Sequence, residues 1–151
     1  MITQFLGHIV RGEAIKLVDG GTQRRTFTYI DDGIAALLRI IENPRGIATG
    51  NIYNIGNPAN NYSVRELATM MLDVAKGYPE YRDTAADVTL VDTTAEGYYG
   101  KGYQDVQNRV PKISNTCADL DWKPQIAMDH ALLQIFDAYR SHVADARALV
   151  D

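Results

Sequence analysis

Apolar side chains recur along this chain at two periods, one typical of helices and one typical of strands. In residues 3–11 they follow the helical period, and Gly12 ends the predicted helix. The stripe expected to face the core consists of Phe5, Leu6, Ile9 and Val10. Residues 15–18, Ile-Lys-Leu-Val, predict a short strand immediately afterwards.

A hairpin is predicted around the glycine pair that follows this strand. Residues 19–21, Asp-Gly-Gly, are typical of a tight turn, because glycine adopts positive φ without a steric penalty. The return strand is predicted over residues 25–30, which are rich in β-branched and aromatic side chains. Since side chains alternate along a strand, Arg25 and Arg24 are expected on opposite faces.

Two further segments show helical patterns. One begins at Asp31 or Asp32, either of which can cap it, and stops at Asn43 and Pro44. Its expected inward stripe consists of Ile34, Leu37, Leu38 and Ile41. The other begins with Ser63 in a Ser-x-x-Glu capping box. Its expected inward residues are Val64, Leu67, Met71 and Leu72.

The remaining segments continue the alternation. Strands are predicted over residues 51–55 and 88–91, and a loop rich in glycine and tyrosine over residues 97–103. A short helix is expected to begin at Ser114, and a longer one closes the chain. That last helix carries apolar residues at helical spacing, namely Met128, Leu132, Ile135, Phe136, Tyr139 and Val143. The pattern predicts an α/β or α+β class, with a frayed tail over residues 145–151.

Composition narrows the class further. The 151 residues are 46% hydrophobic and 23% charged, which suits one globular domain and excludes a collagen, a disordered tail or a disulfide scaffold. A net charge of −4 argues against a nucleic-acid partner, and the short apolar runs argue against membrane insertion. The single Cys117 and the absence of a signal segment favour a cytoplasmic setting. The three scattered histidines predict no metal site.

A cationic ribbon is the first candidate for chemistry. Lys16 lies on one predicted strand of the hairpin, and Arg24 and Arg25 lie on the other. Guanidinium groups pair bidentately with phosphate oxygens, and Lys adds a point charge, so a ribbon beside glycine amides suits a diphosphate. The alternative is a solvated hairpin edge, where Lys and Arg discourage aggregation.

The tyrosine-rich stretch over residues 98–109 is the second candidate. It combines three tyrosines with Lys101 and Arg109, which suits stacking on a ring and binding of anionic groups. The alternative is a tyrosine-rich surface loop. Its glycines lack the spacing of a dinucleotide-binding turn, and the chain contains no Tyr-x-x-x-Lys pair. No complete set of catalytic residues is therefore visible.

Three segments in order resemble the extended short-chain dehydrogenases/reductases, the NAD-dependent epimerase/dehydratase family. They are residues 19–33, residues 50–56, and residues 120–124 with the amphipathic helix that follows. The resemblance implies an α/β, Rossmann-type fold. Residues 1–144 would be its C-terminal, substrate-binding part, and the N-terminal half that binds NAD would be missing.

Within that family, residues 98–111 resemble the UDP-glucuronic acid decarboxylases. These oxidise the sugar C4 hydroxyl with NAD⁺, and loss of C6 as CO₂ then yields a UDP-4-keto-pentose. The resemblance implies that Arg109 is catalytic. It also implies that the UDP-sugar is bound by Lys16, Leu17, Val18, Asp19, Gly20, Gly21, Thr22, Gln23, Arg24, Arg25 and Tyr103.

The same resemblance sets expectations for partners. NAD would bind the intact parent enzyme and not this chain alone, which would be inactive by itself. The partners would be UDP-glucuronate and the missing Rossmann half, and a second copy in a homo-oligomer is compatible with the resemblance. Two alternatives remain open, namely a fragment of another nucleotide-sugar epimerase or dehydratase, and a non-catalytic module that binds nucleotide sugars.

Overall fold

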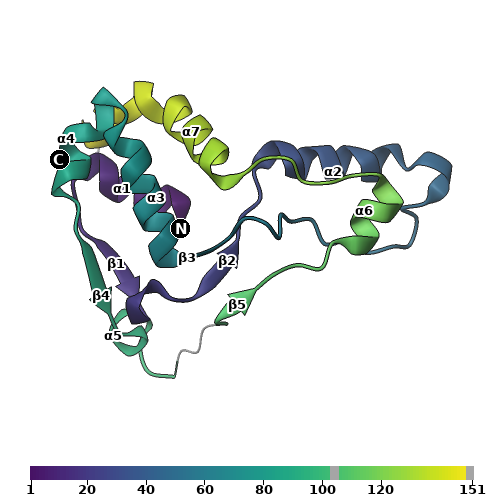
Figure 1. The fold of residues 1–151 in the computed structure, drawn as a ribbon, viewed down its shortest axis with the longest axis horizontal. Coiled ribbons are helices and arrows are strands. Elements are labelled where there is room, and N and C mark those ends of the chain that lie inside the picture. Colours follow the sequence, from purple (N-terminus) through teal and green to yellow (C-terminus); the bar gives the residue numbers. More distant parts are fainter. Residues whose placement is uncertain (103–105, 149–151) are drawn as a thin grey trace. The chain divides into compact units, whose positions relative to one another are not determined.

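Helices and short strands alternate along the chain, which confirms the predicted mixed α/β class (Figure 1). The computed structural model describes residues 1–102 and 106–148. Its contacts divide the chain into two units. Unit 1 combines Met1–Gln23, Ser63–Gln107 and Leu132–Asp151, and unit 2 combines Arg24–Tyr62 and Asn108–Ala131.

Unit 1 contains a group of packed helices, a further short helix and a pair of parallel strands. The packed helices are α1 (Ile2–Arg11), α3 (Val64–Lys76), α4 (Pro79–Asp87) and α8 (Val143–Ala148). The strands are β1 (Ile15–Val18) and β4 (Leu90–Thr93), which lie side by side in Figure 1, with α5 (Ala95–Tyr99) after β4. The helix α7 (Met128–Tyr139) begins in unit 2, enters unit 1, and leads through a 3-10 turn (Arg140–His142) to α8.

Local signals in unit 1 gave accurate predictions. All four predicted residues of the α1 stripe are buried, and Gly12 ends the helix in the left-handed conformation. The capping box of α3 is present, because Ser63 Oγ accepts from the Glu66 amide at 3.1 Å and Glu66 Oε2 accepts from the Ser63 amide at 2.7 Å. The single last helix predicted over residues 128–143 is divided by the 3-10 turn, so Val143 lies on α8. Leu132, Phe136 and Val143 are buried as expected, whereas Ile135 is half-buried and Tyr139 is exposed.

The core of unit 1 includes a buried tyrosine on α4, a helix that the hydrophobic pattern does not predict. Tyr81 packs edge-on against Phe136 with ring centroids 5.0 Å apart, and its hydroxyl donates to the Phe136 carbonyl oxygen at 2.9 Å. Burial raises the pKa of Tyr81 to about 12. Only Tyr81 and Ala85 of α4 are buried, which is too few to give a helical period.

Unit 2 holds α2 (Ile30–Glu42), α6 (Ser114–Leu120) and a three-stranded sheet. The strands β2 (Arg24–Thr26), β3 (Asn61–Ser63) and β5 (Asn108–Arg109) have the order β3-β2-β5, and β2 pairs with β5 in parallel. The core consists of Ala36, Leu120 and Trp122, with half-buried apolar side chains packed around them. Ser114 is the first residue of α6 but provides no capping hydrogen bond.

The acidic pair at the start of α2 has a different role from the predicted cap. Tyr29 precedes the helix without a side-chain capping bond. Asp32 is buried, and its two carboxylate oxygens accept from the amides of Gln125 at 2.9 Å and Ile126 at 3.0 Å. Trp122 Nε1 donates to the Asp32 carbonyl oxygen at 3.0 Å. Asp32 therefore ties α2 to the segment that precedes α7.

The apolar stripe of α2 does not face a core, contrary to the prediction. Ile34 is 46% exposed and Ile41 is 76% exposed, and Leu37, Leu38 and Ile30 are exposed as well. The helix packs instead through the small Ala36, which is fully buried near α6. An exposed apolar stripe of this length is unusual for the surface of a monomeric protein.

The predicted hairpin is wrong. β1 pairs with β4, and β2 lies in the other sheet. Asp19, Gly20 and Gly21 all have positive φ, at 48°, 72° and 66°, and form a 3-10 turn in place of a two-residue hairpin loop. Three successive left-handed residues redirect the chain, so the two strands that flank them do not become neighbours.

The strand predicted over residues 51–55 is also wrong. Its carbonyl groups bond to side chains of α6, since Thr116 Oγ1 donates to the Asn54 carbonyl oxygen at 2.8 Å and Asn115 Nδ2 to that of Ile52 at 3.3 Å. Ile52 is 89% exposed. The segment contains residues that favour strands, but it has no neighbouring strand to pair with.

The end of the chain is helical as far as residue 148, although residues 145–151 were expected to fray. Arg147, near the end of α8, holds it in unit 1, because its Nε donates to the Val10 carbonyl oxygen at 3.0 Å and its Nη2 to that of Glu80 at 3.1 Å. Among the described residues, no helix is both long and apolar enough to cross a membrane.

Candidate functional site

The residues predicted to bind substrate are divided between the two units. Lys16 to Gln23 belong to unit 1, whereas Arg24, Arg25 and Arg109 belong to unit 2. Tyr103 lies outside the described residues. Each group is therefore described within its own unit.

In unit 1 the glycine turn is held in place by contacts on two sides. Arg65 Nε donates to the Gly20 carbonyl oxygen at 2.8 Å, and the Arg65 guanidinium also pairs with Asp92 on β4. The Asp19 carboxylate accepts from the amide of Ala95 at 3.0 Å. These bonds fix the backbone of the turn. No sequence pattern singles out Arg65, because its position beside the turn depends on tertiary packing.

Gly21 is required by both conformation and space. Its φ is +66°, and a Cβ added there would lie 3.0 Å from the Arg65 amide nitrogen. Gly20 has a similar φ of +72°, but a Cβ there would meet only Thr22 Cγ2 at 3.9 Å. The main chain of α3 thus approaches the turn closely at Gly21.

The side chains around the turn differ in what they can offer to a ligand. Leu17 and Val18 are buried core residues, so a ligand could reach only their backbone. Gln23 is also buried, and its carbonyl oxygen accepts from the Val64 amide at 3.1 Å. Lys16 and Thr22 are exposed. Asp19 is exposed as well, so the exposed side chains are a cation, a hydroxyl and a carboxylate that already accepts from the Ala95 amide.

Lys16 lies near one tyrosine of the tyrosine-rich stretch. A small pocket of about 140 Å³ is lined by Gln4, Phe5, His8, Ile15, Lys16 and Tyr98. On α5, the Tyr98 hydroxyl oxygen accepts a hydrogen bond from Gln4 Nε2 at 3.4 Å. The Tyr98 ring packs edge-on against the Tyr99 ring, with ring centroids 4.7 Å apart. Within unit 1 the structure therefore brings part of both predicted constellations together.

In unit 2, Arg25 and Arg109 share one groove. They are directly paired residues of the parallel strands β2 and β5, so their side chains leave the sheet on the same face. The groove has a volume of about 430 Å³. Its lining consists of Arg25, Thr26, Thr28, Asn54, Ile55, Gly56, Arg109, Val110 and Pro111.

The two arginines of β2 have different surroundings. The Arg24 guanidinium donates to the Asn61 carbonyl oxygen, whereas Arg25 lines the groove and donates through Nη1 to the Arg24 carbonyl oxygen at 2.8 Å. Arg109 is exposed, and among the described residues its guanidinium has no hydrogen-bond or ion-pair partner. Two cations at one groove suit a carboxylate or phosphate, which a guanidinium binds through paired N–H groups.

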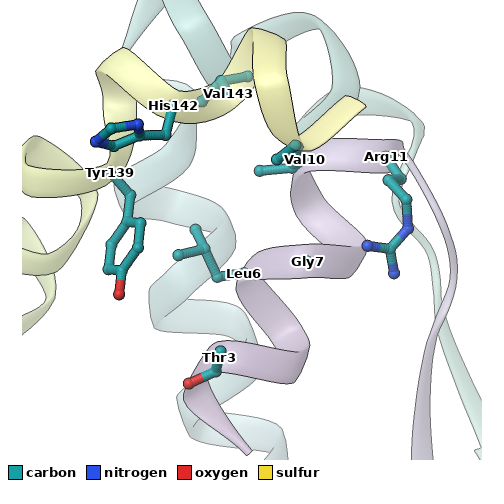
Figure 2. A pocket seen from close by; sticks show the side chains of 9 residues that line it. Thr3, Leu6, Gly7, Val10, Arg11, Tyr139, His142 and Val143 are labelled. Carbon is teal, nitrogen blue, oxygen red and sulfur yellow. The ribbon is translucent and has the colours of Figure 1, made fainter. Parts of the chain in front are cut away.

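An apolar groove in unit 1 has a different character (Figure 2). Leu6 and Val10 from α1 face the C-terminal segment, where Tyr139 and Val143 line the other side, and the volume is about 150 Å³. Arg11 lies at its edge with the guanidinium bonded to Glu13 at 2.7 Å. Most of the lining is apolar, and Thr3, Tyr139 and His142 add polar atoms to it.

The residues of this chain do not fit a dinucleotide cofactor. NAD needs a glycine-rich turn between a strand and a helix, and no such pattern occurs in the sequence. The glycines at 97, 100 and 102 do not meet this need, because Gly97 lies inside α5 and the other two follow that helix. In the part of the chain that the structure describes, no three His, Cys, Asp or Glu side chains gather as metal ligands.

Comparisons with known proteins found a family model and several solved structures that resemble this chain. Residues 1–56 match the model of the NAD dependent epimerase/dehydratase family. The PbgP3 protein from Burkholderia pseudomallei is 62% identical, with a TM-score of 0.85. That match covers 99% of this chain but 41% of the PbgP3 chain. The chain thus spans about two fifths of the length of the solved protein it resembles.

Two more distant structures share the fold. The UDP-glucose 4-epimerase from Thermotoga maritima is 20% identical with a TM-score of 0.70, and the match covers 94% of this chain and 40% of that one. A UDP-glucuronic acid 4-epimerase from Bacillus cereus, solved with UDP-glucuronic acid and NAD, is 18% identical with a TM-score of 0.68. That match covers 93% of this chain and 38% of the epimerase.

Proposed function

We propose that this chain is the C-terminal, substrate-binding part of an NAD-dependent epimerase/dehydratase family enzyme, and that the intact enzyme decarboxylates UDP-glucuronate. The observation that carries the proposal is the groove of unit 2, where Arg25 and Arg109 occupy paired strand positions. The match to PbgP3 over nearly the whole chain supports the family assignment.

The decarboxylase assignment rests on the stretch that ends at Arg109. Residues 98–111 resemble the decarboxylase half of the bifunctional polymyxin-resistance protein ArnA, whose product leads to 4-amino-arabinose on lipid A. UDP-glucuronate differs from an ordinary nucleotide sugar in having a carboxylate at C6 of the sugar. A guanidinium in an open groove is the side chain best suited to bind it.

Arg109 would act by electrostatics. In the C4-keto acid, decarboxylation breaks the C5–C6 bond, and its electron pair passes to the C4 oxygen as an enolate. A guanidinium near these atoms first binds the carboxylate and then stabilises the developing negative charge. It is poorly suited to donate a proton to C5, because arginine remains protonated in proteins. Water or another group would supply that proton.

Two separate groups of residues, one in each unit, suit the phosphate part of the substrate. Arg25 offers a second cation in the groove, and Lys16 and the turn amides offer donors in unit 1. These groups match a UDP diphosphate in charge and in hydrogen-bonding character. Leu17, Val18 and Gln23 would contribute through their backbone only, because their side chains are buried.

The cofactor and the rest of the fold would come from a segment outside this chain. Since no residue pattern here fits NAD, the dinucleotide would bind an N-terminal Rossmann half. The exposed stripe of α2, with Ile34 and Ile41 in it, is the surface that such a half would cover. The chain alone would then bind substrate weakly and perform no oxidation, and the enzyme would work in the cytoplasm.

A second candidate is an epimerase that acts on UDP-glucuronate. The Bacillus cereus enzyme shares the fold and was solved with that compound. The same groove would then bind the carboxylate, and the carboxylate would stay on the sugar instead of leaving as CO₂. The two candidates differ in the product, because an epimerase inverts C4 and retains C6.

The test uses the full-length protein that carries this chain, incubated with UDP-glucuronate and NAD⁺. We expect NADH to accumulate with one UDP-4-keto-pentose per NADH, and we expect the 151-residue chain alone to form none. Conversion to a UDP-hexuronate without net NADH would support the epimerase. NADH formation by the chain alone would contradict the assignment of the cofactor site to another segment.

A further inference from the structure

The main chain around Arg109 is held by contacts from two neighbouring segments of unit 2. On one side, Thr26 Oγ1 donates to the Arg109 carbonyl oxygen at 2.8 Å. On the other side, Asn54 Nδ2 donates to the Lys112 carbonyl oxygen at 3.2 Å. The strand β5 contains only two residues, so these side-chain bonds supply much of what keeps it in register.

The tightest of these contacts is between Gly56 and Pro111. A Cβ added at Gly56 would lie 2.5 Å from Pro111 Cγ, 3.4 Å from its Cβ and 3.7 Å from its Cδ. The φ of Gly56 is not positive, so glycine is needed there for space and not for backbone conformation. The proline ring is rigid, which means that it cannot move aside without its main chain.

The Arg109 side chain contrasts with its fixed backbone. It is exposed, and the described residues provide no bond to its guanidinium. Where the guanidinium can reach is therefore set by the position and direction of its Cα. That position depends on the pairing with Arg25, on Thr26 and on the packing of Pro111 two residues later.

We propose that Gly56 is a positioning residue for Arg109. By leaving room for the Pro111 ring, it places the segment after β5 so that the Arg109 guanidinium points into the groove beside Arg25. The consequence for turnover rests on the proposed function, but the geometric claim does not. A methyl group at position 56 would displace Pro111 and move Arg109 relative to a bound carboxylate.

The kinetic test is a double-mutant cycle in the full-length protein with UDP-glucuronate. Gly56→Ala should lower kcat by about 10- to 100-fold with little change in KM, because small misplacements of a catalytic group have effects of this size. In an Arg109→Ala background the same substitution should change kcat by less than about twofold. A full additional loss in that background, or an unchanged kcat in Gly56→Ala, would overturn the proposal.

Pro111→Ala provides the matched control. It removes the ring atom that the new methyl group would strike, so the double variant Gly56→Ala with Pro111→Ala should recover most of the lost kcat. Pro111→Ala alone should cost less than Gly56→Ala. A double variant as slow as Gly56→Ala would show that the steric contact is not the cause.

A spectroscopic test is independent of the proposed function. In the ¹⁵N-labelled 151-residue chain, Gly56→Ala should shift the amide signals of Arg109 and Val110, and Pro111→Ala should return them toward their original positions. Unmoved signals would overturn the positioning role even if the enzyme is a decarboxylase. If the signals move but the full-length protein does not consume UDP-glucuronate, only the proposed function fails.

Discussion

Arg25 and Arg109 are directly paired residues of the neighbouring parallel strands β2 and β5, and both line the same groove. Strands lie about 4.8 Å apart, so this register keeps two guanidinium groups within reach of a single anion. Like charges at paired positions repel each other. A carboxylate or phosphate bound between them would reduce that repulsion.

The two arginines should have separable effects in the full-length protein. Arg109→Ala should lower kcat for UDP-glucuronate by about 10²- to 10³-fold, as expected for loss of a group that stabilises developing charge. It should weaken UDP binding much less. Arg25→Ala should mainly raise KM. Steady-state kinetics and UDP titration measure both effects, and an unchanged kcat in Arg109→Ala would return this residue to a structural role.

Alanine at Gly21 should be more harmful than alanine at Gly20. Both residues have positive φ, so both variants pay about 1 kcal/mol for the left-handed conformation. Only at Gly21 would the new Cβ press against the Arg65 amide nitrogen, 3.0 Å away. Urea unfolding of the two variants measures the difference. An equal loss of unfolding free energy in the two variants would indicate that the close approach of α3 does not restrict the residue at position 21.

Asp32→Ala should destabilise the chain by about 2–4 kcal/mol, because it leaves two buried amide donors without an acceptor. Asp31→Ala is the matched control. Asp31 is exposed and adjacent, and we expect a change within about 0.5 kcal/mol. Thermal or denaturant unfolding reports both. A similar small effect for the two variants would contradict the role of Asp32 in tying α2 to the later segment.

Polar substitutions on the α2 stripe should weaken binding to the N-terminal half without changing the stability of the isolated chain. Leu37→Gln and Ile41→Gln remove exposed apolar side chains, so the isolated chain should keep its unfolding free energy within about 0.5 kcal/mol. Binding to a separately produced N-terminal half should fall by more than about tenfold. Arg39→Gln, in the same helix but off the stripe, should leave that binding unchanged. Equal effects of all three would exclude the stripe as the docking surface.

The buried Tyr81 should make stability depend on alkaline pH. Its pKa is raised to about 12, while an unfolded tyrosine titrates near 10. The neutral form is favoured in the fold, so this contribution is complete below about pH 10 and is lost as the pH rises toward 12. Across that window the loss should be about 2–3 kcal/mol relative to Tyr81→Phe. Parallel pH curves for the two proteins would show that Tyr81 is not the titrating group.

The accurate predictions from sequence concern features that depend on nearby residues. The α1 stripe is defined by spacing and ended by Gly12, and the α3 capping box is made by Ser63 and Glu66 with their own amides. Each is complete within about one turn of helix. Such signals need no knowledge of the rest of the molecule.

The wrong predictions concern features that depend on a distant partner. The hairpin failed because β4, more than seventy residues later, takes the place beside β1. The stripe of α2 has a helical period, but a period cannot say whether a surface is present to cover it. Arg65 and Gly56 were missed for the same reason, since each acts on a segment that only tertiary structure brings near.

The most direct test of the central claim is the fate of the substrate carboxylate. Full-length protein is incubated with NAD⁺ and UDP-glucuronate carrying ¹⁴C at C6, and released CO₂ is trapped and counted. We predict labelled CO₂ in equal amount to NADH, and a loss of that release in Arg109→Ala. Complete retention of the label in a UDP-hexuronate, with Arg25 and Arg109 intact, would contradict the decarboxylase assignment.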